Sequence, residues 1–307
     1  MKDGVMTLRS FLQTEKIKVF SGGAALEKEP GLEPKNGRFI ENISRLVPVH
    51  VRNGGVPAEA LKKAEADILV EPALSRAAVL LASRRVELGG GERIDVIEIS
   101  RAARDIPVTP PWSTSSVLLA GFRAQRAGKV EVTADDVRAA SHDVSVPASK
   151  SAAAVLLAVK RAELGKAAGV SKSDIEAAAG DLPEDAQWAY AAVLLASRRA
   201  ELAGENDVTA AALERSLNDM PGNVRWNEPA VILAGYQAAR QGKREITPAA
   251  LKQSLGDIVG LATYAPAISL LAVRRIELAE QRQKEARKSR IALASVHLTS
   301  VRAASGR

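Results

Sequence analysis

The stretch Val79-Leu80-Leu81-Ala82 decides the fold, because close copies of it return every 38 residues along the chain. A fixed period of this length is typical of repeat proteins, in which each unit buries its apolar face against its neighbours. The sequence therefore predicts an all-α, right-handed α-solenoid built from six 38-residue repeats. The five later copies are Val117-Leu118-Leu119-Ala120, Val155-Leu156-Leu157-Ala158, Val193-Leu194-Leu195-Ala196, Val231-Ile232-Leu233-Ala234 and Ser269-Leu270-Leu271-Ala272.

Each repeat is predicted to contain two helices. The first, as in residues 191–203, is rich in Ala, Leu and Arg and precedes Gly204, a residue suited to a helix C-terminus. The second starts after a β-branched residue and a capping residue, as at Val208-Thr209. Equivalent pairs occur at Val56-Pro57, Ile94-Asp95, Val132-Thr133, Val170-Ser171 and Ile246-Thr247. The unit resembles the general class of α-solenoids that includes HEAT and TPR arrays, although its period matches neither.

The repeats also indicate an internal duplication, because units 114 residues apart are the most alike. Residues 77–85 recur unchanged at 191–199, and Trp112 corresponds to Trp226. We therefore expect two copies of a three-repeat block. Six units would also allow a closed ring of twelve helices. Rings of that kind that act on sugars usually line their bore with aromatic residues, and a 3% aromatic content favours an open, curved array instead.

Charge and composition divide the chain into three parts. Residues 1–40 match no repeat and are predicted to form a partly disordered N-terminal extension; residues 41–280 form the repeat domain. Residues 281–307 are a basic tail, with seven basic residues and one acidic residue in a chain of net charge +7. Apolar residues among the basic ones would let this tail cap the last repeat, dock into a partner or touch an anionic surface.

One position of the repeat holds aspartate in all six units, near the end of the second helix. A carboxylate is unfavourable at a helix C-terminus, so a compensating partner is expected. We interpret these residues as structural, in a turn or paired with an arginine of the adjoining helix; a row of carboxylates that binds cations or basic peptides is the alternative. They are Asp67, Asp105, Asp143, Asp181, Asp219 and Asp257.

Two neighbouring positions of the first helix form a candidate binding column. Cations with two interleaved aromatic residues could follow a phosphate backbone. Glutamates two or three residues further on, such as Glu87 and Glu163, offer local pairing instead, which would make the column a solvated or ion-paired face. The column comprises Arg84, Arg85, Phe122, Arg123, Lys160, Arg161, Arg198, Arg199, Tyr236, Arg274 and Arg275.

The sequence contains no nucleophile–base arrangement, phosphate loop or dinucleotide motif, so we expect no enzymatic activity, cofactor or metal. The absence of cysteine favours an intracellular, cytoplasmic setting. A secreted effector without a cleavable signal peptide is the alternative, and the composition suggests a bacterial origin. We predict a scaffold that binds a protein partner along its extended helical surface. The alternative function is nucleic-acid binding through the Arg/Lys column and the basic tail.

Overall fold

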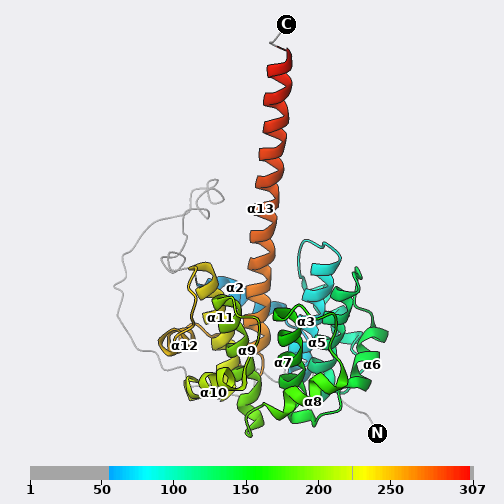
Figure 1. Cartoon of the computed structure of the whole chain (residues 1–307), viewed down its shortest axis with the longest axis vertical. Coiled ribbons are helices and arrows are strands. Elements are labelled where there is room, and N and C mark those ends of the chain that lie inside the picture. Colours follow the sequence, from blue (N-terminus) through cyan, green and yellow to red (C-terminus); the bar gives the residue numbers. More distant parts are fainter. Residues whose placement is uncertain (1–54, 223, 305–307) are drawn as a thin grey trace, which may run out of the picture. The chain divides into compact units, whose positions relative to one another are not determined.

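The computed structural model describes residues 55–222 and 224–304, and all of the regular structure in this part of the chain is α-helical (Figure 1). These residues belong to one compact unit, Val47–Arg307. The predicted N-terminal extension, residues 1–40, lies outside the described residues.

The recurring apolar stretches lie on six long helices, which we call the inner helices. Each contacts the inner helix before it and the one after it. Their Ala, Val and Leu side chains form most of the buried core, with Val79, Leu81 and Leu157 fully buried. The inner helices are α3 (Pro72–Leu88), α5 (Pro110–Arg126), α7 (Ala148–Leu164), α9 (Ala186–Ala203), α11 (Val224–Arg240) and the first part of α13 (Ala265–Ala304).

Six shorter helices, which we call the outer helices, each pack against one inner helix. Five of them follow their inner partner directly along the chain, so that each pair forms a helical hairpin. The sixth, α2, comes before all the inner helices. The outer helices are α2 (Ala58–Asp67), α4 (Val96–Arg104), α6 (Ala134–Asp143), α8 (Lys172–Gly180), α10 (Ala210–Asn218) and α12 (Pro248–Leu255).

The capping pairs place the starts of the outer helices correctly. Thr133 and Ser171 each form a capping box, in which their hydroxyl accepts from a backbone N–H and an Asp three residues on accepts in return. Asp95, Thr209 and Thr247 also cap their helices, whereas Pro57 gives α2 no side-chain cap. Five of the six inner helices end as predicted, with a left-handed residue in one shared position: Gly90, Gly128, Gly204, Gly242 and, without glycine, Lys166 at φ 56°.

The expectation of an open array is wrong, because the two ends of the helical series meet. Helix α13 contacts α11, as the series requires, but it also packs against α2 and α3. It thus holds α2 as its outer helix and α3 as its next inner neighbour, and the helices form a closed ring. We call this contact the closure seam. Low aromatic content argued only against a sugar-binding bore; it carries no information about the angle between successive hairpins.

The basic tail continues the last inner helix. Helix α13 runs unbroken to Ala304 and projects away from the other helices (Figure 1). Residues 283–289 are all exposed. We call residues 281–304 the arm. Among the described residues, no helix is long and apolar enough to cross a membrane.

Candidate functional site

One arginine position of the candidate column ties each hairpin to the next. Arg85 Nη1 lies 2.7 Å from Asp105 Oδ2, and Arg85 Nε donates to the Val132 carbonyl of the following hairpin at 2.8 Å. We call this arrangement an arginine bridge. It recurs at Arg123 with Asp143, Arg161 with Asp181, Arg199 with Asp219 and Arg275 with Asp67, each arginine also donating to a backbone carbonyl.

The bridges account for the aspartates near the ends of the outer helices. An arginine guanidinium can satisfy a carboxylate and a carbonyl together, and this offsets the unfavourable position of the negative charge. The Arg85 side chain is 7% exposed, so this cation is part of the packing between hairpins and not a surface group. The sixth aspartate, Asp257, differs because Gln237 occupies the arginine position of its hairpin.

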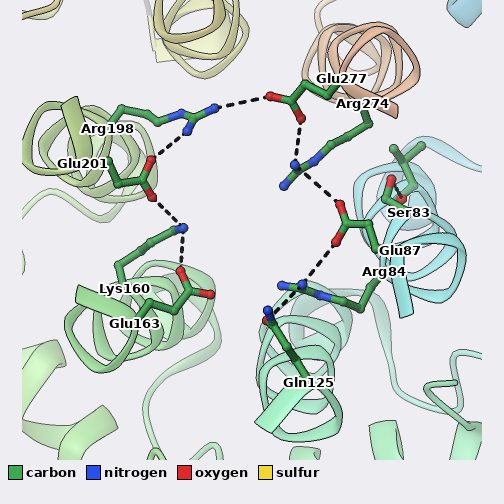
Figure 2. Close-up of polar contacts among 11 residues, drawn as sticks. Ser83, Arg84, Glu87, Gln125, Lys160, Glu163, Arg198, Glu201, Arg274 and Glu277 are labelled. Atoms are coloured by element: carbon green, nitrogen blue, oxygen red, sulfur yellow. Dashed lines mark hydrogen bonds and ion pairs between the residues drawn. The ribbon is translucent and has the colours of Figure 1, made fainter. Parts of the chain in front are cut away.

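The neighbouring position of the column faces the centre of the ring in the four helices where it holds a cation. Its cations alternate with glutamates three residues further along the same helices, and Figure 2 shows both pointing inward from α3, α7, α9 and α13. We call this set the charged ring: Arg84, Glu87, Lys160, Glu163, Arg198, Glu201, Arg274 and Glu277. The local pairing that the sequence offered is present in all four helices.

Other contacts of the charged ring join different helices. Lys160 Nζ lies 2.9 Å from Glu201 Oε1, and Arg274 Nη1 lies 3.5 Å from Glu87 Oε1 (Figure 2). Arg198 Nη2 reaches Glu277 Oε1 at 3.7 Å, past α11. The Arg274–Glu87 pair crosses the closure seam. Ion pairs therefore also join the first and the last inner helix, which do not follow one another along the chain.

Two glycines make room for the side chains of Arg84 and Arg198 in the charged ring. A Cβ atom at Gly121 of α5 would lie 3.2 Å from Arg84 Cγ, and one at Gly235 of α11 would lie 3.4 Å from Arg198 Cγ. The next residues in these helices, Phe122 and Tyr236, are the aromatic members of the column. They are 1% and 2% exposed, so they belong to the core.

Neighbouring charges favour the ionised forms of Glu201 and Arg274 in the charged ring. Burial alone would raise the pKa of Glu201, but Lys160 and Arg198 outweigh it and hold that pKa below its ordinary value. Burial alone would lower the pKa of Arg274, and Glu87 and Glu277 reverse the shift. With four cations and four carboxylates, the ring is neutral as a whole.

A chamber of about 160 Å³ lies inside the ring of helices, and all six inner helices contribute to its wall. The charged ring lies at the end where the inner helices finish. Towards their beginnings, each helix contributes to the chamber wall an aliphatic residue at the same repeat position. We call these six residues the apolar belt: Leu80, Leu118, Leu156, Leu194, Ile232 and Leu270.

A polar cluster lies beyond the belt, near the beginnings of the inner helices. Arg76 Nη1 donates to Glu228 Oε2 at 2.9 Å, and the Arg76 guanidinium lies 4.5 Å from the centre of the Tyr190 ring. Burial raises the pKa of Glu228, which Arg76 only partly offsets, and it raises the pKa of Tyr190 to about 12. We call these three residues the basal cluster; Tyr190 and Glu228 line the chamber.

Sequence reasoning missed the basal cluster. Its members share one repeat position, which holds a different residue in every unit: Arg76, Thr114, Ala152, Tyr190, Glu228 and Pro266. Conserved positions attract attention in a repeat, whereas these side chains are recognisable only by their variation. Their convergence becomes evident once the ring is closed, because Arg76 and Glu228 lie in helices far apart in sequence.

Comparison with protein-family models, with curated proteins and with solved structures found no match to this chain. Among the described residues, no group of three or more His, Asp or Glu side chains is arranged to hold a metal ion. Any proposal about function therefore depends on the geometry of the ring, the chamber and the arm.

Proposed function

We propose that the chain is a non-enzymatic scaffold whose ring presents the arm to an acidic protein partner. The observation that carries the proposal is the contrast between the cations of the ring and those of the arm. Every cation of the candidate column lies beside a carboxylate. For Lys284, Arg287 and Lys288 no ion pair occurs among the described residues, and all three are exposed.

The amino-acid order of the arm suits it to pack against a partner. Helices in proteins owe most of their stability to an apolar face buried in tertiary contacts. The arm carries its basic residues first and then the apolar residues Ile291, Leu293, Val296, Leu298 and Val301. A partner groove with acidic residues near the ring and an apolar lining further out would complement this order.

A groove at the base of the arm gives such a partner a place to begin. It has a volume of about 510 Å³ and lies between α11 and α13, with Lys284 and Arg287 on its wall. Arg240 also lines it but is paired with Glu280 at 3.2 Å. The two arm cations therefore supply its available positive charge.

A direct test uses the full chain and a labelled helical peptide that has leucines on one face and glutamates beside them. We expect binding that weakens at least tenfold when Lys284, Arg287 and Lys288 are all changed to Ala. The matched control changes three exposed lysines of the outer helices, Lys62, Lys172 and Lys252, to Ala and so removes the same amount of positive charge. Equal loss in both variants, or no binding, contradicts the proposal.

Nucleic-acid binding is the second candidate, and the exposed cations of the arm are what favour it. The column supports it less, because its cations are already paired. Titration of the same three proteins with duplex DNA at two salt concentrations separates the candidates. Tighter binding to DNA than to the peptide, with a steep salt dependence and loss only in the arm variant, would favour nucleic acid.

A further inference from the structure

We propose that the central chamber binds a small, uncharged molecule with an apolar body about the size of benzene and one hydroxyl or N–H donor. This site is separate from the arm and adds a second binding activity to the scaffold. The inference rests on the volume of the chamber, the chemistry of its wall and the basal cluster at one end.

The volume sets the size of the guest. A cavity of about 150 Å³ lined by aliphatic and aromatic side chains can stay dry and bind benzene. The chamber has a volume of about 160 Å³, and its middle section is the apolar belt. The belt gains from an apolar guest and itself gives water none of the two or more polar partners that water requires.

The charges at the two ends exclude an ionic guest. The four cations of the charged ring are balanced by its four glutamates, and Glu228 is paired with Arg76. A charged molecule would lose its hydration and find each opposite charge already occupied. A neutral molecule avoids that penalty.

One hydrogen-bond acceptor in the basal cluster determines which polar group the guest should carry. Arg76 Nη1 donates to Glu228 Oε2, and within the described part of the chain no donor reaches the other carboxylate oxygen of this chamber-lining residue, so we take that oxygen as the acceptor for the guest. A hydrogen bond from a neutral donor to a carboxylate is stronger than one between neutral groups. A guest such as phenol could fill the belt with its ring and donate its hydroxyl proton to Glu228.

The wall contains one further polar side chain that lacks a hydrogen bond, that of Ser197. Ser197 is buried and its hydroxyl has no hydrogen-bond partner among the described residues. The equivalent residue of the other block, Ser83, donates to the Val79 carbonyl at 2.7 Å. The two serines hold matching positions of the chamber wall, and only the Ser197 hydroxyl lacks a partner there.

The test is a titration of the full chain with phenol and with toluene, observed through isotope-labelled Leu and Ile methyl groups. We expect shifts in methyl groups of the belt, such as those of Leu80 and Ile232, and none at Leu251, which lies in α12. Phenol should bind about tenfold more tightly than toluene. Absence of belt shifts at millimolar concentrations of both probes overturns the proposal.

Variants identify the contacts. Glu228→Gln should reduce the preference for phenol to about threefold or less, whereas the control Glu176→Gln, at an exposed position on α8, should leave it unchanged. Ile232→Phe should fill the chamber and abolish binding of both probes. Binding of toluene to a folded Ile232→Phe protein, or an unchanged preference in Glu228→Gln, overturns the proposal. If Ile232→Phe fails to fold, the Glu228→Gln comparison decides.

Discussion

Five outer helices follow their inner partner along the chain, whereas α2 reaches its partner α13 from the opposite end of the sequence. The contacts are nevertheless alike. Arg275 Nη1 lies 2.7 Å from Asp67 Oδ2 at the closure seam, as Arg85 Nη1 does from Asp105 Oδ2 within the series. Arg275 Nε also donates to the Ile94 carbonyl at 2.7 Å. Side chains specify this interface without help from chain connectivity, but only non-covalent contacts hold it closed.

The largest difference between the closure seam and the other hairpin interfaces is expected when two matched leucines are truncated. Leu61 of α2 and Leu213 of α10 occupy the same repeat position, and each is 1% exposed. Truncation of a buried leucine to alanine costs about 2–5 kcal/mol. For Leu213→Ala this loss should lower the free energy of unfolding of the whole ring. For Leu61→Ala it should appear as local opening of α2, which can detach while the other hairpins stay folded.

Native-state hydrogen exchange distinguishes the two results. In Leu61→Ala, amide protection should fall in α2 and stay near the native level in α8. In Leu213→Ala, amide protection should fall in α2 and in α8 alike. Equal loss throughout the ring in the two variants would show that the closure seam opens only when everything unfolds.

A smaller effect is expected from the arginine bridges. Arg275→Gln and Arg161→Gln each leave a carboxylate and a carbonyl without their shared donor, which should cost about 1–3 kcal/mol. The closure variant should again loosen α2 selectively, and the Arg161 variant should reduce global stability in urea. A double-mutant cycle of Arg275→Gln with Asp67→Asn should be non-additive; strictly additive losses would refute the bridge at the seam.

The hairpin of α11 and α12 offers the opposite experiment, since Gln237 stands where the other hairpins have arginine. Gln237→Arg should introduce a bridge to Asp257 and raise the free energy of unfolding by up to about 1 kcal/mol. Gln237→Lys is the control, because a lysine ammonium lacks the fork that joins a carboxylate and a carbonyl. An equal gain from both variants would indicate simple charge attraction instead.

The smallest effect concerns the helix starts, where α8 has a capping box and α2 has none. Hydrogen bonds from the Ser171 hydroxyl and backbone lower the pKa of Asp174. The stability from this depressed pKa is fully present above the ordinary Asp pKa of about 4 and is lost as the pH falls through the folded-state value. Asp174→Asn should therefore cost about 0.5 kcal/mol at pH 7 and almost nothing at pH 2, as measured by thermal unfolding. A pH-independent difference would contradict the linkage.

Repetition made the helices predictable. The recurring apolar stretches and capping pairs place inner and outer helices correctly, because helix formation and capping depend on residues close in sequence. The glutamates near Arg84 and Lys160 likewise indicated the local pairs of the charged ring.

Closure was harder to predict, although the sequence carried a signal at its two ends. Every bridging arginine lies twenty residues before its aspartate, except at the seam. Twenty residues after Arg275 comes Ser295, and twenty residues before Asp67 comes Val47. An arginine without an aspartate at one end and an aspartate without an arginine at the other together imply a ring. Reading each repeat by itself conceals that match.

The basal cluster makes the two three-repeat blocks unequal. Arg76 and Tyr190 hold equivalent positions in the two three-repeat blocks, as do Thr114 and Glu228. A symmetric dimer of two identical blocks would carry the same residue at both equivalent positions, so it would hold either two Arg–Glu pairs or none. In this chain the two blocks belong to one polypeptide and differ at both positions. One cation, Arg76, therefore meets one anion, Glu228, and the base of the ring is asymmetric.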